Sequence, residues 1–306
     1  MTLRLNKFQP AILLAFFLPA ISWAQPPLLI DSFESGDMST TNKDGFQWEK
    51  NNRTSIVTPD RVVWNNGPRD VARPEGRDWQ PKTGSHALRF NYAAGEPMAE
   101  QRFRLGQDYK EIWFSFWLKV PHNYEHKGRN RKLFALWMDG YSSNGQGTTI
   151  AWEFWPDGDK ASKLAISHQA NIDGERSKSG HQQHYRFIRY PEDHGRWMQL
   201  VLRARASDPG AENGLIQAWQ RWEDEQEYRQ MHDVQNAPLN PPPSGPQGWA
   251  RGYVLGWAND AYNKQTEWLM DDFTVSKSSL LEKSPLQLTE VPAPPRSLQA
   301  HTGVAK

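Results

Sequence analysis

The chain of 306 residues contains no cysteine, which excludes a disulfide bond and a lipid attachment site. It also has no long hydrophobic run: the apolar stretch over residues 11–21 is too short to span a bilayer, and no later stretch approaches that length. No segment of useful length shows the 3.6-residue apolar period of a helix. We therefore expect a fold that depends on a core of strands, without a membrane span.

A strong charge of either sign is missing as well. Thirty-six Lys and Arg residues face 35 Asp and Glu residues, for a formal net charge of +1. A nucleic-acid binder would show a basic domain or stripe, so no nucleic acid is expected as a partner. The basic cluster over residues 127–132 is the local exception, and we interpret it as a solvated loop between two strands rather than as a nucleic-acid contact.

The N-terminus has the features of a secretory signal. Arg4 and Lys7 precede the apolar stretch, and Ser22, Trp23 and Ala24 form a small-x-small cleavage site. We expect residues 1–24 to be a signal peptide and the protein to be secreted or periplasmic in a bacterium.

Tryptophan is abundant, with 15 in the chain. The segment from Glu111 to Val120 alternates strictly, so that Phe114 and Phe116 point one way while Trp113 and Trp117 point the other. Indole rings beside polar groups suit sugars, although Trp is also a good core residue.

Alternating runs separated by Gly, Pro, Asn and Asp recur along the chain and predict antiparallel strands. Many such strands indicate an all-β sandwich or jelly roll of two antiparallel sheets, here one domain over residues 25–276. Residues 277–306 are predicted to be a disordered tail. Three segments are predicted as long loops: Asn51–Lys82, Asp173–Tyr190 and Met231–Gln247.

Five segments together resemble the concanavalin-A-like jelly roll, and within it secreted polysaccharide lyases related to heparin lyase I, glucuronan lyase and alginate lyase. They are Asp31–Asp37, Thr83–Phe90, Gly195–Leu202, Gly214–Trp219 and Trp268–Val275. The resemblance implies this fold and an acidic, uronate-containing polysaccharide as substrate. Because lectins, hydrolases and lyases share the scaffold, it does not fix the activity.

One strand carries the charges that such a lyase needs. Glu100, Arg102 and Arg104 share a face, and their spacing is similar to the Arg-x-Glu-x-Arg strand of alginate lyases, with Met98 in place of the first arginine. The resemblance implies that Arg102 neutralises the uronate carboxylate while Glu100 and Arg104 bind substrate. The alternative is an idle Arg–Glu pair on a sheet face.

The resemblance to the Gln-x-His motif of alginate lyases, though not matched residue for residue, makes His168 a candidate base and Gln169 a candidate substrate ligand. The alternative, which the strand pattern favours, is that His168 caps the edge of the core, since it shares a strand face with Leu164 and Ile166. Tyr124 is a candidate proton donor to the leaving oxygen.

Three more residues are candidates for substrate binding. Trp117 and Arg203 lie on polar strand faces that would suit an acidic polymer or a solvated outer sheet, and Asn259 lies where alginate lyases keep a Tyr-Asn strand. The lysine of that pattern is missing here.

The resemblance also implies a structural calcium site, for which Glu34, Gly84 and Asp271 are the nearest matches. We expect Asp271 to share a face with Phe273 and Val275 and to be partly buried. An aspartate bonded to backbone N–H groups is the alternative.

We therefore expect a monomeric lyase that cleaves by β-elimination and needs no cofactor for catalysis. A non-catalytic carbohydrate-binding protein is the main alternative. A glycoside hydrolase is less favoured, because no pair of carboxyl groups has suitable spacing.

Overall fold

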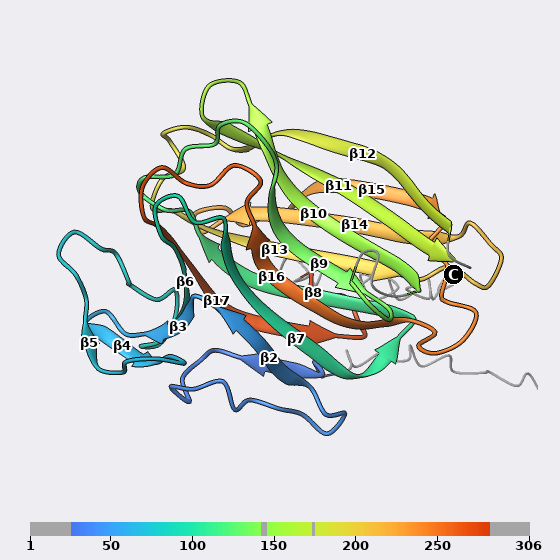
Figure 1. The fold of residues 1–306 in the computed structure, drawn as a ribbon, viewed down its shortest axis with the longest axis horizontal. Helices are drawn as coiled ribbons and strands as arrows, with labels where there is room; N and C mark the ends of the chain where they lie inside the picture. Colours follow the sequence, from blue (N-terminus) through green and yellow to red (C-terminus); the bar gives the residue numbers. More distant parts are fainter. Residues whose placement is uncertain (1–25, 142–145, 173–174, 282–306) are drawn as a thin grey trace, which may run out of the picture.

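The computed structural model describes residues 26–141, 146–172 and 175–281, and for residues 171–183 and 185 it describes only the backbone of the strands. The described residues contain strands and no helix, and the strands form two antiparallel sheets stacked as a β-sandwich jelly roll (Figure 1). The predicted fold class is confirmed. No helix among the described residues is long and apolar enough to cross a membrane.

The ten-stranded sheet has the following strands in spatial order: β15 (Arg229–Ala237), β14 (Gly214–Trp222), β13 (Trp197–Arg205), β8 (Glu111–Lys119), β17 (Thr266–Ser276), β6 (Ala87–Tyr92), β3 (Thr54–Val57), β4 (Arg61–Trp64) and β5 (Val71–Ala72). The short strand β1 (Leu29–Asp31) pairs with β17.

The seven-stranded sheet has this order: β12 (Glu175–Ile188), β11 (Ala161–Ile172), β10 (Gly147–Asp157), β9 (Arg131–Trp137), β16 (Trp249–Trp257), β7 (Met98–Tyr109) and β2 (Gln47–Asn52). Every pairing between the described strands of both sheets is antiparallel, for example β7 with β16 and β8 with β13.

The core lies between the two sheets and consists of the inward residues of each alternating strand. Phe114 and Phe116 of β8 meet Phe103 and Phe134 of the facing sheet, with ring centroids between 5.0 and 5.8 Å apart for the pairs in contact. Phe273 of β17 joins this cluster. Burial of these rings supplies the main driving force for the fold.

The predicted long loops are partly wrong. The segment Asn51–Lys82 contains the end of β2 and strands β3 to β5, while Asp173–Tyr190 contains β12. The segment Met231–Gln247 begins inside β15. These strands lie at or near sheet edges and are short, or rich in polar residues, so the apolar alternation that reveals a strand is weak in them.

Residues 1–24, the predicted signal peptide, and residues 282–306 of the predicted tail lie outside the described residues.

Candidate functional site

The outward face of the seven-stranded sheet contains the charged residues that the sequence predicts for a site. The strand register aligns Arg102 with Tyr253, Tyr253 with Ala135, Ala135 with Ala151, and Ala151 with Ser167. The neighbouring row, which runs from Phe103 to His168, is the inward one. Alternation across β7, β16, β9, β10 and β11 therefore places Arg102 on the outward face, at the β7 end of this row.

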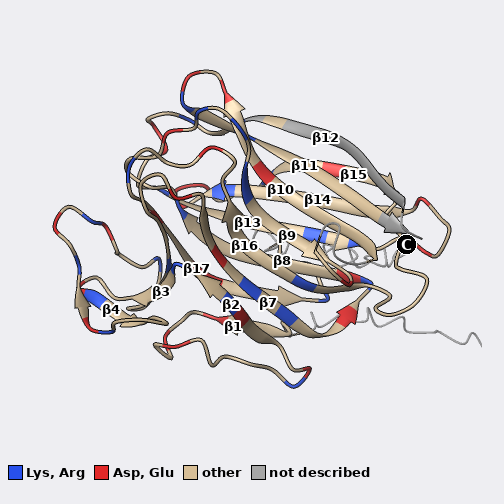
Figure 2. Ribbon diagram, viewed as in Figure 1, with Lys and Arg blue, Asp and Glu red and all other residues tan. Residues whose placement is uncertain are grey.

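Arg102 is the charged residue of this outward row. Its Nε donates a hydrogen bond to Oε1 of Glu100 at 2.5 Å, and its guanidinium lies 5.8 Å from the ring centroid of Trp137. The Arg102 side chain is 31% exposed, whereas Glu100 is buried. Figure 2 shows the basic segments along β7 beside the acidic one. A guanidinium held at Nε by a buried acid presents its two Nη groups in a fixed plane, as bidentate carboxylate binding requires.

Three aromatic residues form a cluster beside Arg102. The rings of Trp137, Tyr141 and Tyr253 lie with centroids 5.3 to 5.8 Å apart, and the Tyr141 and Tyr253 hydroxyls are hydrogen-bonded at 2.8 Å. Burial, followed by the effect of Tyr141, raises the pKa of Tyr253 well above its usual value. Tyr253 therefore stays protonated, and its hydroxyl can hold the half-buried Tyr141 hydroxyl in place.

An ion pair between Lys132 and Glu153 lies further along the same face. Glu153 also accepts hydrogen bonds from Trp155 Nε1 at 2.8 Å and from Asn130 Nδ2 at 2.7 Å. Burial would raise the pKa of Glu153, but the Lys132 charge and these hydrogen bonds outweigh burial and lower it. Asn259, a predicted substrate ligand, donates to Asn130 Oδ1 at 2.7 Å and so supports this pair.

A hollow of about 390 Å³ lies at the other end of the face and is lined by Arg104 and Arg251 together with Asp108, Met138 and Asp139. The Arg104 side chain is 43% exposed and donates to Gln47 of the edge strand. Arg251 is exposed and lies opposite Arg104 in the register. Arg251 was not among the residues predicted for the site, although it shares the alternation of Tyr253 and Trp257.

The predicted catalytic residues are not brought together. His168 lies on the inward face of β11, in register with Ile150, so it points away from Arg102; burial lowers its pKa. Tyr124 is fully buried at one end of the sandwich, where its hydroxyl is 2.6 Å from Ser162 Oγ, and burial raises its pKa. Neither residue can reach a substrate bound at Arg102.

The predicted substrate ligands are divided between two faces. Gln169 is on the outward face of β11, with Glu100 and Arg104 further across the same sheet. Trp117 and Arg203 lie on the outward face of the ten-stranded sheet, on the opposite side of the sandwich. A single glycan strand bound to one face cannot contact residues of both.

The predicted calcium ligands surround one turn over residues 82–86. Asp271 Oδ2 accepts hydrogen bonds from the N–H groups of Lys82 and Thr83 at 2.9 and 3.0 Å. Asp271 is fully buried, and desolvation raises its pKa to about 7. The prediction that it shares a face with Phe273 and Val275 is wrong, because a bulge after Asp271 turns it outward, opposite Trp117.

Glu34 holds the other side of this turn. Burial would raise its pKa, but hydrogen bonds from Ser85 and His86 lower it to about 2. Gly84 has φ +57°, and a Cβ there would lie 2.3 Å from Glu34 Oε1. Within the described ranges, no three His, Asp or Glu side chains gather as a metal site would require. Calcium needs six to eight oxygen ligands, so these residues fit the hydrogen-bonded alternative better.

No family model and no curated protein matches the sequence. Solved structures with a similar arrangement include the marine PL-14 alginate lyase from Aplysia kurodai, with TM-score 0.46, 11% identity and coverage of 63% of this chain and 84% of that one. Another is alginate lyase vAL-1 from Chlorella virus, with TM-score 0.42, 10% identity and coverage of 77% and 95%.

A third similar structure is the exoplasmic/lumenal domain of VIP36 in a Ca²⁺- and Man2-bound form, with TM-score 0.39, 14% identity and coverage of 78% and 85%.

Proposed function

We propose that the outward face of the seven-stranded sheet binds an acidic, uronate-containing polysaccharide and cleaves it by β-elimination. The observation that carries the proposal is the placement of Arg102, fixed by Glu100 and packed near Trp137, beside the hydrogen-bonded tyrosine pair. We also propose that residues 1–24 direct export, which would give the protein access to such polymers outside the cytoplasm.

The proposed chemistry assigns one role to each group. Loss of the C5 proton builds negative charge on the adjacent carboxylate, and the free Nη groups of Arg102 stabilise that charge. The electron pair of the C–H bond forms the C4–C5 double bond as the C4–O bond breaks. The Tyr141 hydroxyl gives its proton to the leaving oxygen and receives the C5 proton, so that the tyrosine ends as it began. Tyr253 orients it.

This assignment replaces His168 and Tyr124, which the geometry keeps away from Arg102. It keeps Arg102 in the role expected from the sequence. It also leaves Glu100 as the residue that positions the guanidinium, because Glu100 is buried and bonded to Arg102 Nε.

The test is to incubate the purified full chain with a panel of uronate polysaccharides and to follow the ultraviolet absorbance of the unsaturated product. Arg102→Ala should lower kcat/KM by about 10² to 10³-fold, the usual effect of losing a group that stabilises developing charge. Arg203→Ala is the matched control, because Arg203 is a partly exposed arginine near a tryptophan on the other sheet. Equal losses in both variants, or product from neither the wild type nor the variants, would contradict the lyase.

Binding without cleavage is the second candidate function. This candidate is favoured because two basic residues of the face already have acidic partners: Arg102 bonds Glu100, and Lys132 bonds Glu153. Retention of a polymer on the panel with no unsaturated product and no new reducing ends would select this candidate. New reducing ends without unsaturation would indicate hydrolysis instead.

A further inference from the structure

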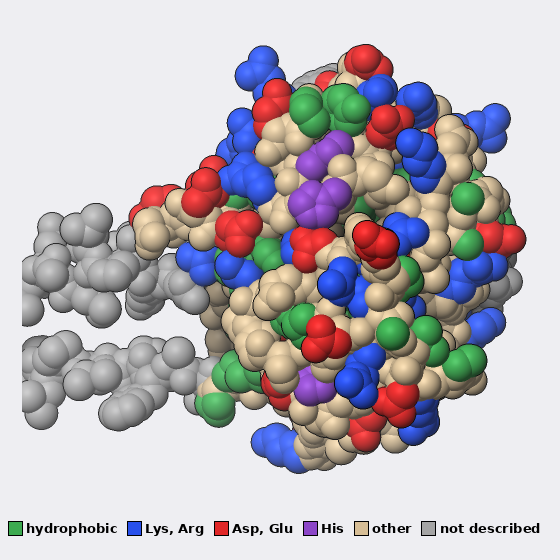
Figure 3. All heavy atoms as spheres, turned by 90° about the vertical axis from the view of Figure 1, so that its left-hand side faces the viewer, with side chains coloured by type: hydrophobic (Ala, Val, Ile, Leu, Met, Phe, Trp, Pro, Cys, Tyr) green, Lys and Arg blue, Asp and Glu red, His purple; other side chains and the backbone are tan. Residues whose placement is uncertain are grey.

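A second hollow, separate from the outward face, lies at one end of the sandwich. Its volume is about 480 Å³, within the range of small-molecule sites. Three connections far apart in sequence line it: residues 122–131 between β8 and β9, residues 190–194 between β12 and β13, and residues 260–266 between β16 and β17. Figure 3 shows an end of the molecule where acidic, basic and histidine side chains are mixed.

Arg131 holds two of these connections together. It is 4% exposed, and it donates from Nη1 to the Glu125 carbonyl at 2.7 Å and from Nε to the Asp260 carbonyl at 3.1 Å. Its guanidinium lies 3.9 Å from the Tyr262 ring centroid. A buried arginine bonded to backbone on both sides fixes the wall of the hollow, so the hollow is formed before any ligand arrives.

Two glycines allow the connections to approach each other. At Gly195 (φ +74°) a Cβ would lie 2.2 Å from the His122 ring, and at Gly128 (φ +71°) a Cβ would lie 2.6 Å from the Asp260 carboxylate. Both positions have the left-handed backbone that favours glycine. The His122 ring in turn bonds Asp78 at 2.9 Å. These close contacts leave the connections little freedom to collapse into the hollow.

The charges around the hollow leave one cation available. Glu125 is paired with Lys160 at 3.1 Å and with Lys127 at 3.5 Å, and these lysines lower its pKa. Lys264 is exposed on the opposite side and has no ion pair within the part of the chain described here. The hollow is lined by three basic side chains, Lys127, Arg131 and Lys264, and by two acidic ones, Glu125 and Asp260, so the lining keeps an excess of one positive charge, which favours an anionic ligand.

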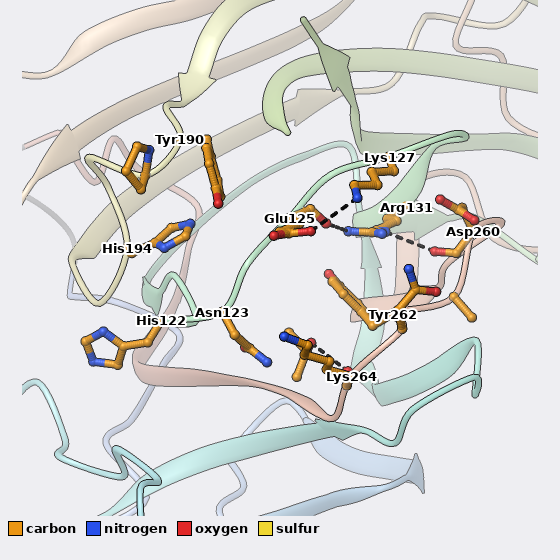
Figure 4. Close-up of a pocket in the computed structure, with 14 residues that line it drawn as sticks. His122, Asn123, Glu125, Lys127, Arg131, Tyr190, His194, Asp260, Tyr262 and Lys264 are labelled. Carbon is orange, nitrogen blue, oxygen red and sulfur yellow. Dashed lines mark hydrogen bonds and ion pairs between the residues drawn. The ribbon is translucent and has the colours of Figure 1, made fainter. Parts of the chain in front are cut away.

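The remaining lining suits a sugar. Figure 4 shows Tyr190 and Tyr262 on opposite sides of the hollow, with Asn123 and Lys264 along its lower edge. Asn123 donates its Nδ2 to the Gln265 carbonyl at 2.9 Å, which leaves its Oδ1 to accept a hydroxyl hydrogen bond. The Asn123 amide and the tyrosine hydroxyls can bond the hydroxyls of a sugar, whereas the Tyr190 ring is already covered by Lys160, whose Nζ lies 4.7 Å from the ring centroid.

We propose that this hollow binds a single uronate unit, with its carboxylate on Lys264 and a hydroxyl on the amide oxygen of Asn123. This site is distinct from Arg102 and does not depend on whether the outward face cleaves a polymer. Asn259 and Asn130 connect the two regions, because Asn130 bonds Glu153 on the face while the next residues, Asp260 and Arg131, line the hollow. A glycan end could thus reach the hollow from the face.

The test is to titrate the full chain with D-glucuronate, D-glucose and sodium sulfate by calorimetry or by protein-observed NMR. We expect glucuronate to bind at least about tenfold more tightly than either glucose or sulfate. Lys264→Gln should weaken glucuronate binding by about tenfold, equivalent to ~1.4 kcal/mol, and leave glucose binding unchanged. Lys43→Gln, an exposed lysine outside the hollow, should leave all three affinities unchanged.

Several results would overturn the site. They are equal affinities for glucuronate and glucose, sulfate binding as tight as glucuronate binding, no glucuronate binding at all, or full affinity in Lys264→Gln. Arg102→Ala separates this site from the proposed lyase: it should retain glucuronate binding at the hollow even where polymer cleavage is lost. Failure of cleavage in the wild type, with Lys264-dependent glucuronate binding intact, would count against the lyase alone.

Discussion

The outward faces of the two sheets have similar composition but different pairing. On the ten-stranded sheet, Trp113 stacks on Trp219 with centroids 5.5 Å apart, and Arg203 lies near Trp113 while bonded to Glu111 and Gln217. On the seven-stranded sheet, Arg102 bonds one acid through Nε only. Arg203 on the ten-stranded sheet is thus bonded to neighbouring side chains at both Nε and Nη1. Arg102 on the seven-stranded sheet is bonded at Nε, which leaves its Nη groups to bind a ligand.

The difference shows that residue type alone does not mark a binding face. Trp117 illustrates this, because Lys82 and Arg221 lie 4.6 and 5.7 Å from its ring centroid on the ten-stranded sheet. Cations already occupy the space in which a sugar would stack. The outward face of the seven-stranded sheet instead keeps Arg251 and Trp257 exposed.

The largest effect is expected when a tryptophan is removed from either outward face. A buried tryptophan should contribute to stability, whereas an exposed one should contribute to polymer binding. Trp113→Ala removes a 6% exposed indole that is stacked on Trp219, so we expect the free energy of unfolding to fall by about 3 to 5 kcal/mol. Polymer affinity of the folded protein should not change. Trp257→Ala removes a side chain that is 47% exposed, so this variant should lose polymer affinity while its free energy of unfolding hardly changes. Denaturant titration and a polymer-binding assay on both variants measure these two quantities. If Trp113→Ala impaired polymer binding and Trp257→Ala did not, the assignment of binding to the seven-stranded sheet would be wrong.

The next effect concerns the tyrosine pair of the seven-stranded sheet. Tyr253→Phe removes the 2.8 Å hydrogen bond to Tyr141 while keeping the ring. We expect kcat to fall by about 10² with little change in KM, because Tyr253 is proposed to orient the proton-transferring hydroxyl. Tyr228→Phe, whose hydroxyl bonds Gln199 on the other sheet, is the control. An equal loss of kcat in Tyr228→Phe would show that the effect is not specific to the seven-stranded sheet.

A pH-dependent effect is expected on the ten-stranded sheet. Burial raises the pKa of Asp271 from 3.8 to about 7 in the folded state, so the native protein binds more protons than the unfolded chain between these values. The contribution of Asp271 to stability should therefore decrease as the pH rises from about 4 to 7, by up to ~1.4 kcal/mol per pH unit. Urea unfolding at several pH values should show this slope in wild type and a weaker one in Asp271→Asn.

The smallest effect is expected from metal removal. Because Asp271 and Glu34 already bond N–H groups, a chelator should shift the melting temperature by less than about 1 °C, and added Ca²⁺ should do the same. Melting curves with and without each reagent are sufficient. A clear rise with Ca²⁺ would restore the calcium site at Glu34, Gly84 and Asp271.

The fold could be predicted because the alternation of apolar and polar residues along a strand directly indicates a strand with one buried face. The run from Glu111 to Val120 corresponds to β8 with its phenylalanines inward, and β13 and β17 were recognised in the same way. The segment now divided among β3, β4 and β5 escaped prediction because each strand is four residues or fewer. Such short strands have too few alternations to be distinguished from a loop.

The site was harder to predict, because alternation shows which residues share a face but not which face is inward. The strand of His168 has an apolar row and a polar row, and the histidine belongs to the apolar one. Asp271 was misplaced for another reason: the bulge after it, with Asp272 at φ +50°, reverses the alternation and is not visible in the sequence. Tyr141 comes after β9 ends, so no strand pattern could place it beside Tyr253.

The pairing of β1 with β17 brings the two ends of the domain to one place. Leu29 lies opposite Val275, and the Leu28 N–H donates to the Val275 carbonyl at 2.7 Å. A short flexible linker between these positions would close the chain into a ring, and new ends could be opened at the exposed turn over residues 223–227. We expect such a circularly permuted protein to fold, because the cut and the joint both lie on the ten-stranded sheet and leave the opposite sheet intact.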